Sequence, residues 1–339
     1  MQQVIAPVAR ELIEAELTPE RFVRKTSNGN NLIYIVNWYN APNTVTEIGR
    51  LREISFRDAG GGTGLECDID QYDKCSDCFE QLLVWNPTDK EIIGGYRFIH
   101  GRNQKVDASG NLIGPTGKLF SFSEKFIKEY LSKSIELGRS FVQPSYQPMV
   151  NFRKGMYALD NIWDGLGAII VDNPDILYFF GKITMYPQYN IEARDMVLYF
   201  LHRYFPDKKK LASPYEPVEP VIAKEKLDNI FTGASYEENY KILVQQVRER
   251  KEHVPPLVNA YMNLSPTMKT FGTAINYEFG KVEETGIMVT ISDIHEVKRV
   301  RYLDSYINEK LKLLKARMPK IKIKISDLKG KRKRLRRSK

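Results

Sequence analysis

The residues with the most chemical potential in this chain lie in one short stretch, Ser134 to Pro144. Its apolar residues are spaced as in a β-strand, yet Glu136 and Arg139 place a carboxylate and a guanidinium inside it. Charged side chains are almost never fully buried unless they are paired, because burying an unpaired charge is very costly. The stretch is therefore either a solvated edge or part of a site. Gly138 within it predicts a bulge or the close approach of another backbone.

A carboxylate in such a position can serve as a general base, because partial burial raises its pKa toward neutrality. The alternative is structural: Glu136 forms an ion pair with Arg139 or with Arg97 that only fixes the sheet. The sequence leaves both interpretations open.

The cysteines do not predict a metal site. There are three of them, Cys67, Cys75 and Cys78, and an odd number in a chain of 339 residues is no disulfide framework. A structural zinc site needs four ligands, and neither a second pair nor a nearby His accompanies Cys75 and Cys78. We expect reduced thiols and no metal.

Charge is concentrated at the C-terminal end. Of the net charge of +9, residues 320–339 contribute eleven Lys or Arg and one Asp, so the other 319 residues together carry −1. Such a tail is expected to be disordered on its own. It suits an anionic membrane face, an acidic carrier protein or nucleic acid, or it only aids solubility. The neutral body and the lack of a reader motif speak against nucleic acid, and of the remaining partners we favour the membrane.

The N-terminal region and the hydropathy predict a cytoplasmic chain, peripheral at the inner membrane face. No apolar run approaches the ~18 residues of a membrane span. Glu11, Glu14 and Glu16 stand where a signal peptide would be apolar.

Helical and strand patterns alternate along the chain, which predicts an α/β fold. A helix is expected over 4–17 and a strand over Leu32–Val36. A second helix is expected to begin at Thr44 or Thr46, and Thr44 has capping-box spacing to Glu47. Leu82–Trp85 and Ile92–His100 are expected to form a hairpin, and two further strands are expected at 176–183 and 286–291. Further helices are expected around 124–131, 160–170, 191–205, 236–252 and 293–317, and one is expected to begin near Pro256. Gly94 and Gly95 in the hairpin predict close approach of a backbone or ligand. The expected divisions are an N-terminal helix and strand (1–45), a core (46–205), a linker or lid (206–226), a C-terminal α/β extension (227–318) and the basic tail (319–339).

Four motifs occur in a recognisable order: Leu51-Arg52-x-x-x-Phe56, Asp70-Gln71-Tyr72-Asp73, Gly94-Gly95-Tyr96-Arg97 and Glu136-Leu137-Gly138-Arg139. They resemble the acyl-carrier-protein-dependent branch of the GNAT acyltransferases. This branch contains the acyl-homoserine-lactone synthases and the hemolysin-like N-acyltransferases that begin ornithine-lipid and glycine-lipid synthesis. Residues 159–168 and 253–261 look like the lipid-forming members, and the resemblance covers roughly residues 45–290. The Gly-rich loop 60–64 lacks the tryptophan of the lactone synthases, which speaks against a lactone product.

The resemblance implies a GNAT-like mixed twisted sheet flanked by helices, with a C-terminal helical and strand extension. It implies transfer of a (3-hydroxy)acyl chain from acyl carrier protein, or from acyl-CoA, to the α-amine of a small amino acid. Glycine is the first choice and ornithine the second, and no permanently bound cofactor is expected. The alternative is a nucleic-acid-binding or membrane-binding protein without catalysis that acts through its tail.

The resemblance also implies roles for single residues. Glu136 deprotonates the amine, with Arg97 and Arg139 beside it as catalytic residues, while Asp70 and Asp73 orient the arginines or contact the amine. Arginines can hold the amino acid's carboxylate or the carrier's phosphate, because a planar fork suits both. Arg52 and Phe56 are assigned to the substrate. A turn of Asp164, Gly165, Leu166, Gly167 and Ala168 is expected to offer backbone N–H groups to phosphopantetheine, the alternative being that its glycines only serve packing. Phe98, Phe141, Phe179 and Phe180 line either an acyl channel or plain core.

Overall fold

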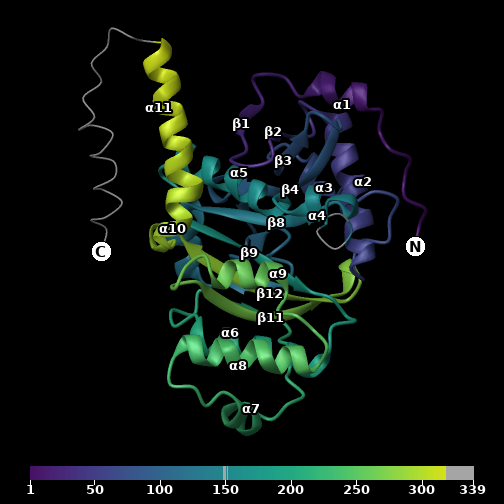
Figure 1. Ribbon diagram of the computed structural model, residues 1–339. Helices are drawn as coiled ribbons and strands as arrows, with labels where there is room; N and C mark the ends of the chain where they lie inside the picture. The colour runs from purple at the N-terminus through teal and green to yellow at the C-terminus, as the bar shows by residue number, and fades with distance from the viewer. Residues whose placement is uncertain (148–149, 151, 318–339) are drawn as a thin grey trace.

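A computed structural model describes residues 1–147, 150 and 152–317. In this part of the chain, eight strands form one mixed sheet, in the order β1-β2-β3-β4-β8-β9-β12-β11 (Figure 1). All neighbours in the sheet are antiparallel except β8 and β9, which are parallel. The strands are β1 (Phe22–Lys25), β2 (Leu32–Val36), β3 (Glu80–Asn86), β4 (Glu91–His100), β8 (Ser134–Val142), β9 (Tyr178–Met185), β11 (Lys269–Asn276) and β12 (Val282–Thr290).

Helices cover one face of the sheet through a single large apolar core. They are α5 (Ala158–Asp172), α6 (Ile191–Tyr204), α8 (Tyr236–Glu249) and α9 (Pro256–Met262). In α5, Ile162 and Leu166 pack with Leu82 of β3 and Leu137 of β8. Below the sheet in Figure 1, α6 and α8 lie side by side, with α7 (Lys224–Ile230) beneath them.

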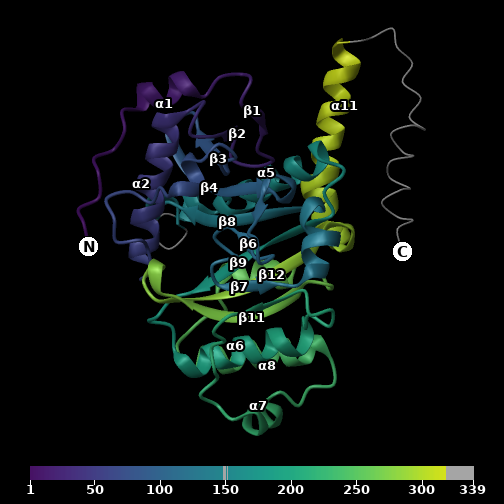
Figure 2. The same cartoon turned by 180° about the vertical axis from the view of Figure 1, so that it is seen from behind.

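The opposite face carries two separate covers, seen from behind in Figure 2. Over the β2–β4 half, α1 (Arg10–Glu16) and α2 (Pro42–Asp58) enclose one apolar cluster. Over the β9–β12–β11 half, a small sheet of β7 (Phe120–Phe122) and β10 (Ala212–Pro214) encloses another. The charged residues of β4 and β8 lie on this face, at the junction of the two covers.

The N-terminus of α2 is stabilised differently from the prediction. The capping box of Thr44 and Glu47 is wrong, because the helix begins earlier, with Ala41 as its N-cap and no side-chain cap of its own. Instead, the Glu16 carboxylate accepts hydrogen bonds from the backbone N–H groups of Asn43 (3.0 Å) and Thr44 (2.7 Å). A carboxylate there satisfies unpaired N–H donors and complements the helix dipole.

Several predicted elements are confirmed and others are wrong. The strand Leu32–Val36 and the hairpin of β3 and β4 are confirmed, and Gly94 and Gly95 do adjoin other backbones: an added Cβ would lie 2.3 Å from the Phe141 oxygen and 2.2 Å from the Leu82 oxygen. The expected helix at 4–17 is restricted to α1. The expected helix at 124–131 is confirmed as a helical segment, in which Phe126–Tyr130 is π-helical and Leu131–Lys133 is a 3-10 turn.

The C-terminal strands β11 and β12 extend the same sheet next to β9, and β11 was not predicted. The remaining elements are α3 (Gln71–Lys74), α4 (Phe152–Gly155), β5 (Lys105–Val106), β6 (Leu112–Ile113), α10 (Glu296–Arg299) and α11 (Ser305–Arg317). In both ribbon views α11 projects away from the body (Figures 1 and 2). The predicted basic tail lies outside the described residues. Within those residues, no helix combines the length and apolar character of a membrane span.

Candidate active site

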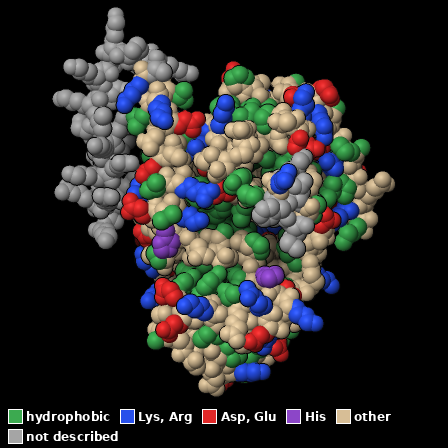
Figure 3. Space-filling view, viewed as in Figure 1, with side chains coloured by type: hydrophobic (Ala, Val, Ile, Leu, Met, Phe, Trp, Pro, Cys, Tyr) green, Lys and Arg blue, Asp and Glu red, His purple; other side chains and the backbone are tan. Residues whose placement is uncertain are grey.

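The parallel pair β8–β9 opens along its length. Pairing runs from Ser134 with Tyr178 to Leu137 with Gly181 and stops there, although both strands continue. A cavity of about 710 Å³ lies where the strands part, and its lining comes from both faces of the sheet. This volume is typical of small-molecule sites. Hydrophobic side chains gather across the middle of the face seen in Figure 3, above the lobe that contains α6, α7 and α8.

A β-bulge in β8 directs the residues that enter this cavity. Gly95 of β4 pairs with Phe141 and Arg97 pairs with Gly138, so β8 has one extra residue between these pairs. Within the bulge, Arg139 has φ +49°, in the left-handed region that non-glycine residues rarely adopt. The bulge predicted at Gly138 is confirmed. Because a bulge re-aims side chains, Glu136 and Arg139 both line the cavity although they lie three residues apart.

Glu136 is a buried carboxylate at the floor of the cavity, with an exposed fraction of 1%. Its Oε1 accepts hydrogen bonds from the Thr116 backbone N–H (3.1 Å) and hydroxyl (2.5 Å), and its Oε2 accepts one from Gln104 Nε2. Burial raises the pKa of Glu136; the Thr116 hydrogen bond and the Lys182 charge oppose this without cancelling it. The side chain therefore has the character of a general base.

The structural alternative for Glu136, an ion pair with Arg97 or Arg139, is wrong. Among the described residues, Glu136 makes no such pair, and both arginines bind aspartates. The cation with the largest effect on the pKa of Glu136 is Lys182 of β9. The Lys182 Nζ contacts the Pro115 carbonyl (2.9 Å) and a Glu284 oxygen (2.7 Å).

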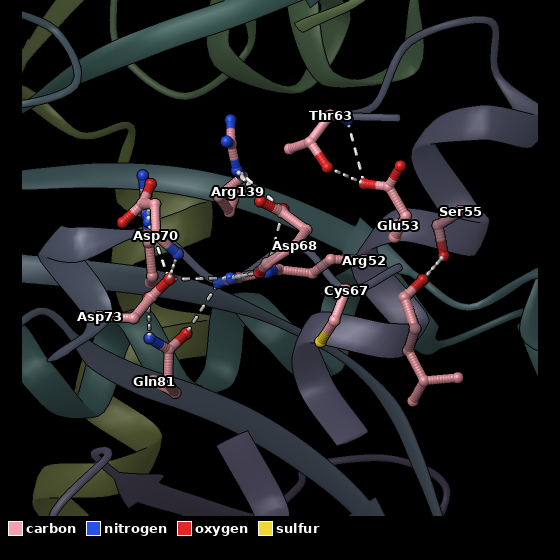
Figure 4. Close-up of polar contacts among 12 residues, drawn as sticks. Arg52, Glu53, Ser55, Thr63, Cys67, Asp68, Asp70, Asp73, Gln81 and Arg139 are labelled. Atoms are coloured by element: carbon pink, nitrogen blue, oxygen red, sulfur yellow. Dashed lines mark hydrogen bonds and ion pairs between the residues drawn. The ribbon is translucent and has the colours of Figure 1, made fainter. Parts of the chain in front are cut away.

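The arginines form a largely buried network with three aspartates, of which Asp70 is half-buried (Figure 4). Arg52 of α2 is fully buried and pairs with Asp68 (3.2 Å) and Asp73 (3.1 Å), and it also donates to Gln81. Burial alone raises the pKa of Asp73, but Arg52 and Arg97 outweigh it and hold that pKa well below its ordinary value. The role of Arg52 is therefore to hold this network, because its guanidinium does not reach the cavity.

The other two arginines connect this network to the cavity. Arg97 Nη1 contacts Asp70 (2.8 Å) and Asp73 (3.2 Å). These contacts fit the first of the two roles predicted for the aspartates, which is to orient the arginines. Arg139 is bound to Asp68 only through Nε (2.9 Å) and stacks on Phe279 at 4.1 Å. In the described part of the chain, its two terminal nitrogens have no partner, and Figure 4 shows that end of the side chain directed away from Asp73. Arg139 thus offers a bidentate donor to an anion in the cavity.

The predicted turn from Asp164 to Ala168 is wrong. All five residues, Asp164, Gly165, Leu166, Gly167 and Ala168, are buried in the interior of α5, where their backbone N–H groups belong to the helix. The glycines serve packing, since an added Cβ would lie 2.7 Å from Leu82 Cδ1 at position 165 and 2.6 Å from the Tyr302 oxygen at position 167. Asp164 accepts hydrogen bonds from the Ser27 backbone N–H and hydroxyl. The cavity is instead lined by the beginning of α5 and the segment before it, including Gly155, Met156, Ala158 and Leu159.

The predicted apolar residues divide between cavity and core. Phe56 and Phe141 line the large cavity, whereas Phe179 and Phe180 line a void of about 20 Å³ at the point where β8 and β9 separate. Phe98 belongs to the core, which was the alternative considered for it.

Sequence reasoning missed the polar residues that other elements bring to this site. Thr116, Gln104 and Lys182 surround Glu136, and Asp68 completes the arginine network. Tyr96, Ser140 and Tyr261 line the small void, with 3.4 Å between the two tyrosine hydroxyls. Tyr96 and Tyr261 lie in stretches that carry the family resemblance but were given no role there. The contacts of the other residues depend on tertiary structure, and no local sequence pattern identifies them.

Comparisons with known proteins show which family this chain is similar to. A family model described as the acetyltransferase (GNAT) domain matches residues 51–153. A glycine N(alpha)-acyltransferase of Bacteroides thetaiotaomicron is 52% identical over 307 residues, covering 91% of both chains. One of Phocaeicola vulgatus is 50% identical over 309 residues, covering 91% of this chain and 95% of its own. A solved structure of the CoA-dependent acyl-homoserine lactone synthase BjaI is similar over 82% of this chain and 89% of its own, at 10% identity and a TM-score of 0.35.

Proposed function

Because this chain belongs to the GNAT acyltransferase family, together with the glycine N(alpha)-acyltransferases that share half of its residues, we propose that it transfers a fatty acyl chain from a thioester to the α-amine of glycine. The prediction of a GNAT-like mixed sheet is confirmed by the strand order and by the family model. The prediction of an enzyme that performs N-acyl transfer is confirmed by the relatives, and the non-catalytic alternatives are set aside. The observation that carries the proposal is Glu136, a buried carboxylate of raised pKa that lines the cavity between β8 and β9.

The chemistry needs one base and one neutral amine. Glycine's ammonium gives a proton to the Glu136 carboxylate, so that one N–H bond breaks and one O–H bond forms. The neutral nitrogen then attacks the thioester carbonyl and the C–S bond breaks. The amide nitrogen loses its second proton, and the products are N-acylglycine, the free thiol of the donor and one released proton.

The cavity offers distinct surroundings for the parts of both substrates. Arg139 holds the glycine carboxylate, since its terminal nitrogens are uncommitted within the described residues. The thioester lies in the gap between the strands, where β8 backbone groups beyond Leu137 have no partner in β9. Apolar lining residues, among them Phe56, Phe141 and Leu257, receive the acyl chain.

We propose acyl carrier protein as the donor, with acyl-CoA as the second candidate, and glycine before ornithine as the acceptor. The purified full chain is incubated with each acyl thioester and each amino acid, and the products are identified by mass spectrometry. N-acylglycine from either donor supports the acyl transfer, and the relative rates distinguish the donors. The absence of any N-acyl amino acid would sink the proposal.

The rate should fall at low pH. Because the pKa of Glu136 is raised above its ordinary value, protonation inactivates the base as the pH falls through that raised pKa. We expect kcat/KM for glycine to show an acid limb above the titration range of an ordinary glutamate, about pH 4.3. A flat profile down to that range would contradict the assignment of Glu136.

Arg139→Lys should weaken glycine binding. Lysine keeps the charge but loses the planar fork, so we expect the KM for glycine to rise by roughly 10- to 100-fold, the cost of lost hydrogen bonds to a charged group. Steady-state kinetics with glycine varied would measure this, with a smaller change in kcat. Arg102→Lys, on an exposed pair with Asp175, is the matched control. An unchanged KM would remove Arg139 from the acceptor site.

We further propose that residues 320–339 hold the enzyme at the anionic inner face of the membrane, where an N-acyl amino acid can enter the bilayer. Support comes from eleven basic residues in this segment against one acid; each contributes about 1 kcal/mol near an anionic surface. Full-length chain should float with vesicles that contain anionic lipid and should dissociate at high salt. A chain ending at residue 319 should not float. Equal flotation of both would refute this role for the tail.

A further inference from the structure

Gln104 contacts the base from the loop that covers it. It follows the 3-10 turn Gly101–Asn103, and its Nε2 donates a hydrogen bond to Glu136 Oε2. The other end of the amide, Oε1, is buried and has no hydrogen-bond partner among the described residues. Gly114 leaves room for this contact, since an added Cβ there would lie 3.1 Å from Gln104 Nε2 and 3.3 Å from Glu136 Oε2.

The two oxygens of Glu136 are not equivalent. Oε1 accepts from the backbone N–H of Thr116, and a backbone N–H can only donate. The Thr116 hydroxyl also donates to Oε1, so both lone pairs of Oε1 are used, and a proton taken up by Glu136 resides on Oε2. That oxygen is the one that Gln104 contacts.

A proton on Oε2 changes what Gln104 must do. The protonated oxygen now has an O–H facing the Nε2 hydrogens, which places two donors against each other. A half-turn of the amide removes this conflict, because it presents the unused Oε1 as an acceptor. We propose that Gln104 is a positioning residue that donates to the Glu136 carboxylate before proton transfer and turns to accept from the carboxylic acid afterwards.

The surroundings of Glu136 favour such an arrangement. The charged groups that face it are Lys182 of β9 and Arg97 of β4, and neither forms a hydrogen bond with it in the described part of the chain. Lys182 is engaged by Glu284 and the Pro115 carbonyl. The direct hydrogen-bond partners of Glu136 are the neutral groups of Thr116 and Gln104. A neutral amide can form a hydrogen bond with either protonation state of the carboxyl group.

This inference rests on the proposed role of Glu136 as the base: the N–H bond of the glycine ammonium breaks and the Oε2–H bond forms. By holding that proton in a hydrogen bond, the turned amide keeps it away from the amine while the nitrogen attacks the thioester.

A double-mutant cycle on stability tests the turning without depending on activity. In Glu136→Gln, the new amide nitrogen replaces a protonated Oε2 and needs an acceptor from Gln104. We expect Gln104→Met to lower the melting temperature by about 2 °C both in wild-type enzyme and in the Glu136→Gln background, because a hydrogen bond is lost in each. If Gln104→Met is neutral in the Glu136→Gln background, the amide acts only as a donor and the proposal is wrong.

The pH profile supplies a readout that a merely structural role would not move. A bond to the charged carboxylate is stronger than a bond to the neutral acid, so Gln104→Met should move the acid limb of kcat/KM to higher pH by about one unit. Gln245→Met, at a hydrogen-bonded glutamine on the surface of α8, should leave it unchanged. Should Gln104→Met fail to fold, Gln104→Glu keeps the size of the side chain. Two carboxyl groups then share a proton, and an unmoved acid limb would overturn the proposal.

The two failures can be told apart. If Glu136 is not the base, Glu136→Gln retains activity whatever the stability cycle gives. If only the turning is wrong, Glu136→Gln is inactive and Gln104→Met leaves the melting temperature of that background unchanged.

Discussion

Glu136→Gln is expected to lower kcat/KM for glycine by about 100- to 10,000-fold, the usual contribution of a general base. Glutamine has nearly the same shape and cannot take a proton from the ammonium. The variant should remain folded, because a buried carboxylate of raised pKa is itself costly and a neutral amide removes that cost. The residual rate should rise with pH, since a larger fraction of glycine is then already neutral.

The measurement compares initial rates of N-acylglycine formation for wild type, Glu136→Gln and the control Glu124→Gln. Glu124 is exposed and pairs only with Lys128, so its replacement should change the rate by less than a factor of about two. A Glu136→Gln enzyme within a few-fold of wild type would show that another group, or water, removes the proton.

Asp73→Asn should destabilise the fold by about 3–5 kcal/mol, the cost of removing one partner from a buried ion pair. Asp73 is fully buried and contacts both Arg52 and Arg97, so its loss leaves two buried guanidiniums with less counter-charge. Urea unfolding would measure the change. The control Asp175→Asn breaks an exposed pair with Arg102 and should cost at most about 1 kcal/mol.

The same substitution should change the response to acid. The pKa of Asp73 is held below its ordinary value, so its stabilising contribution is complete above the unfolded-state pKa of about 4 and is lost as the pH falls through the folded-state pKa. As the pH is lowered below about 4, the free energy of unfolding of Asp73→Asn should therefore fall less than that of wild type. Equal stability of the two proteins at neutral pH would show that the network contributes no net stability.

Local patterns were enough to identify the strand that carries Glu136. Alternating apolar residues predicted β8, and Gly138 beside two charges predicted its bulge, because glycine and strand-interior charges are local signals. The glycines of α5 misled for the same reason: a Gly-x-Gly pattern is equally compatible with a phosphate-binding turn and with close helix packing. Contacts with Leu82 and Tyr302, far away in the sequence, decide for packing.

By itself, the sequence determined that a carboxylate and a guanidinium lie within one predicted strand, and that three arginines and two aspartates follow one another in an order that resembles one acyltransferase branch. Only the tertiary structure decided which charges pair. The register that places Gln81 beside Arg97 and Arg97 beside Gly138 directs the arginines to the aspartates and leaves Glu136 to Thr116 and Gln104. Whether a buried charge is neutralised or kept for proton transfer depends on partners that arrive from distant segments, and only the folded chain brings these segments together.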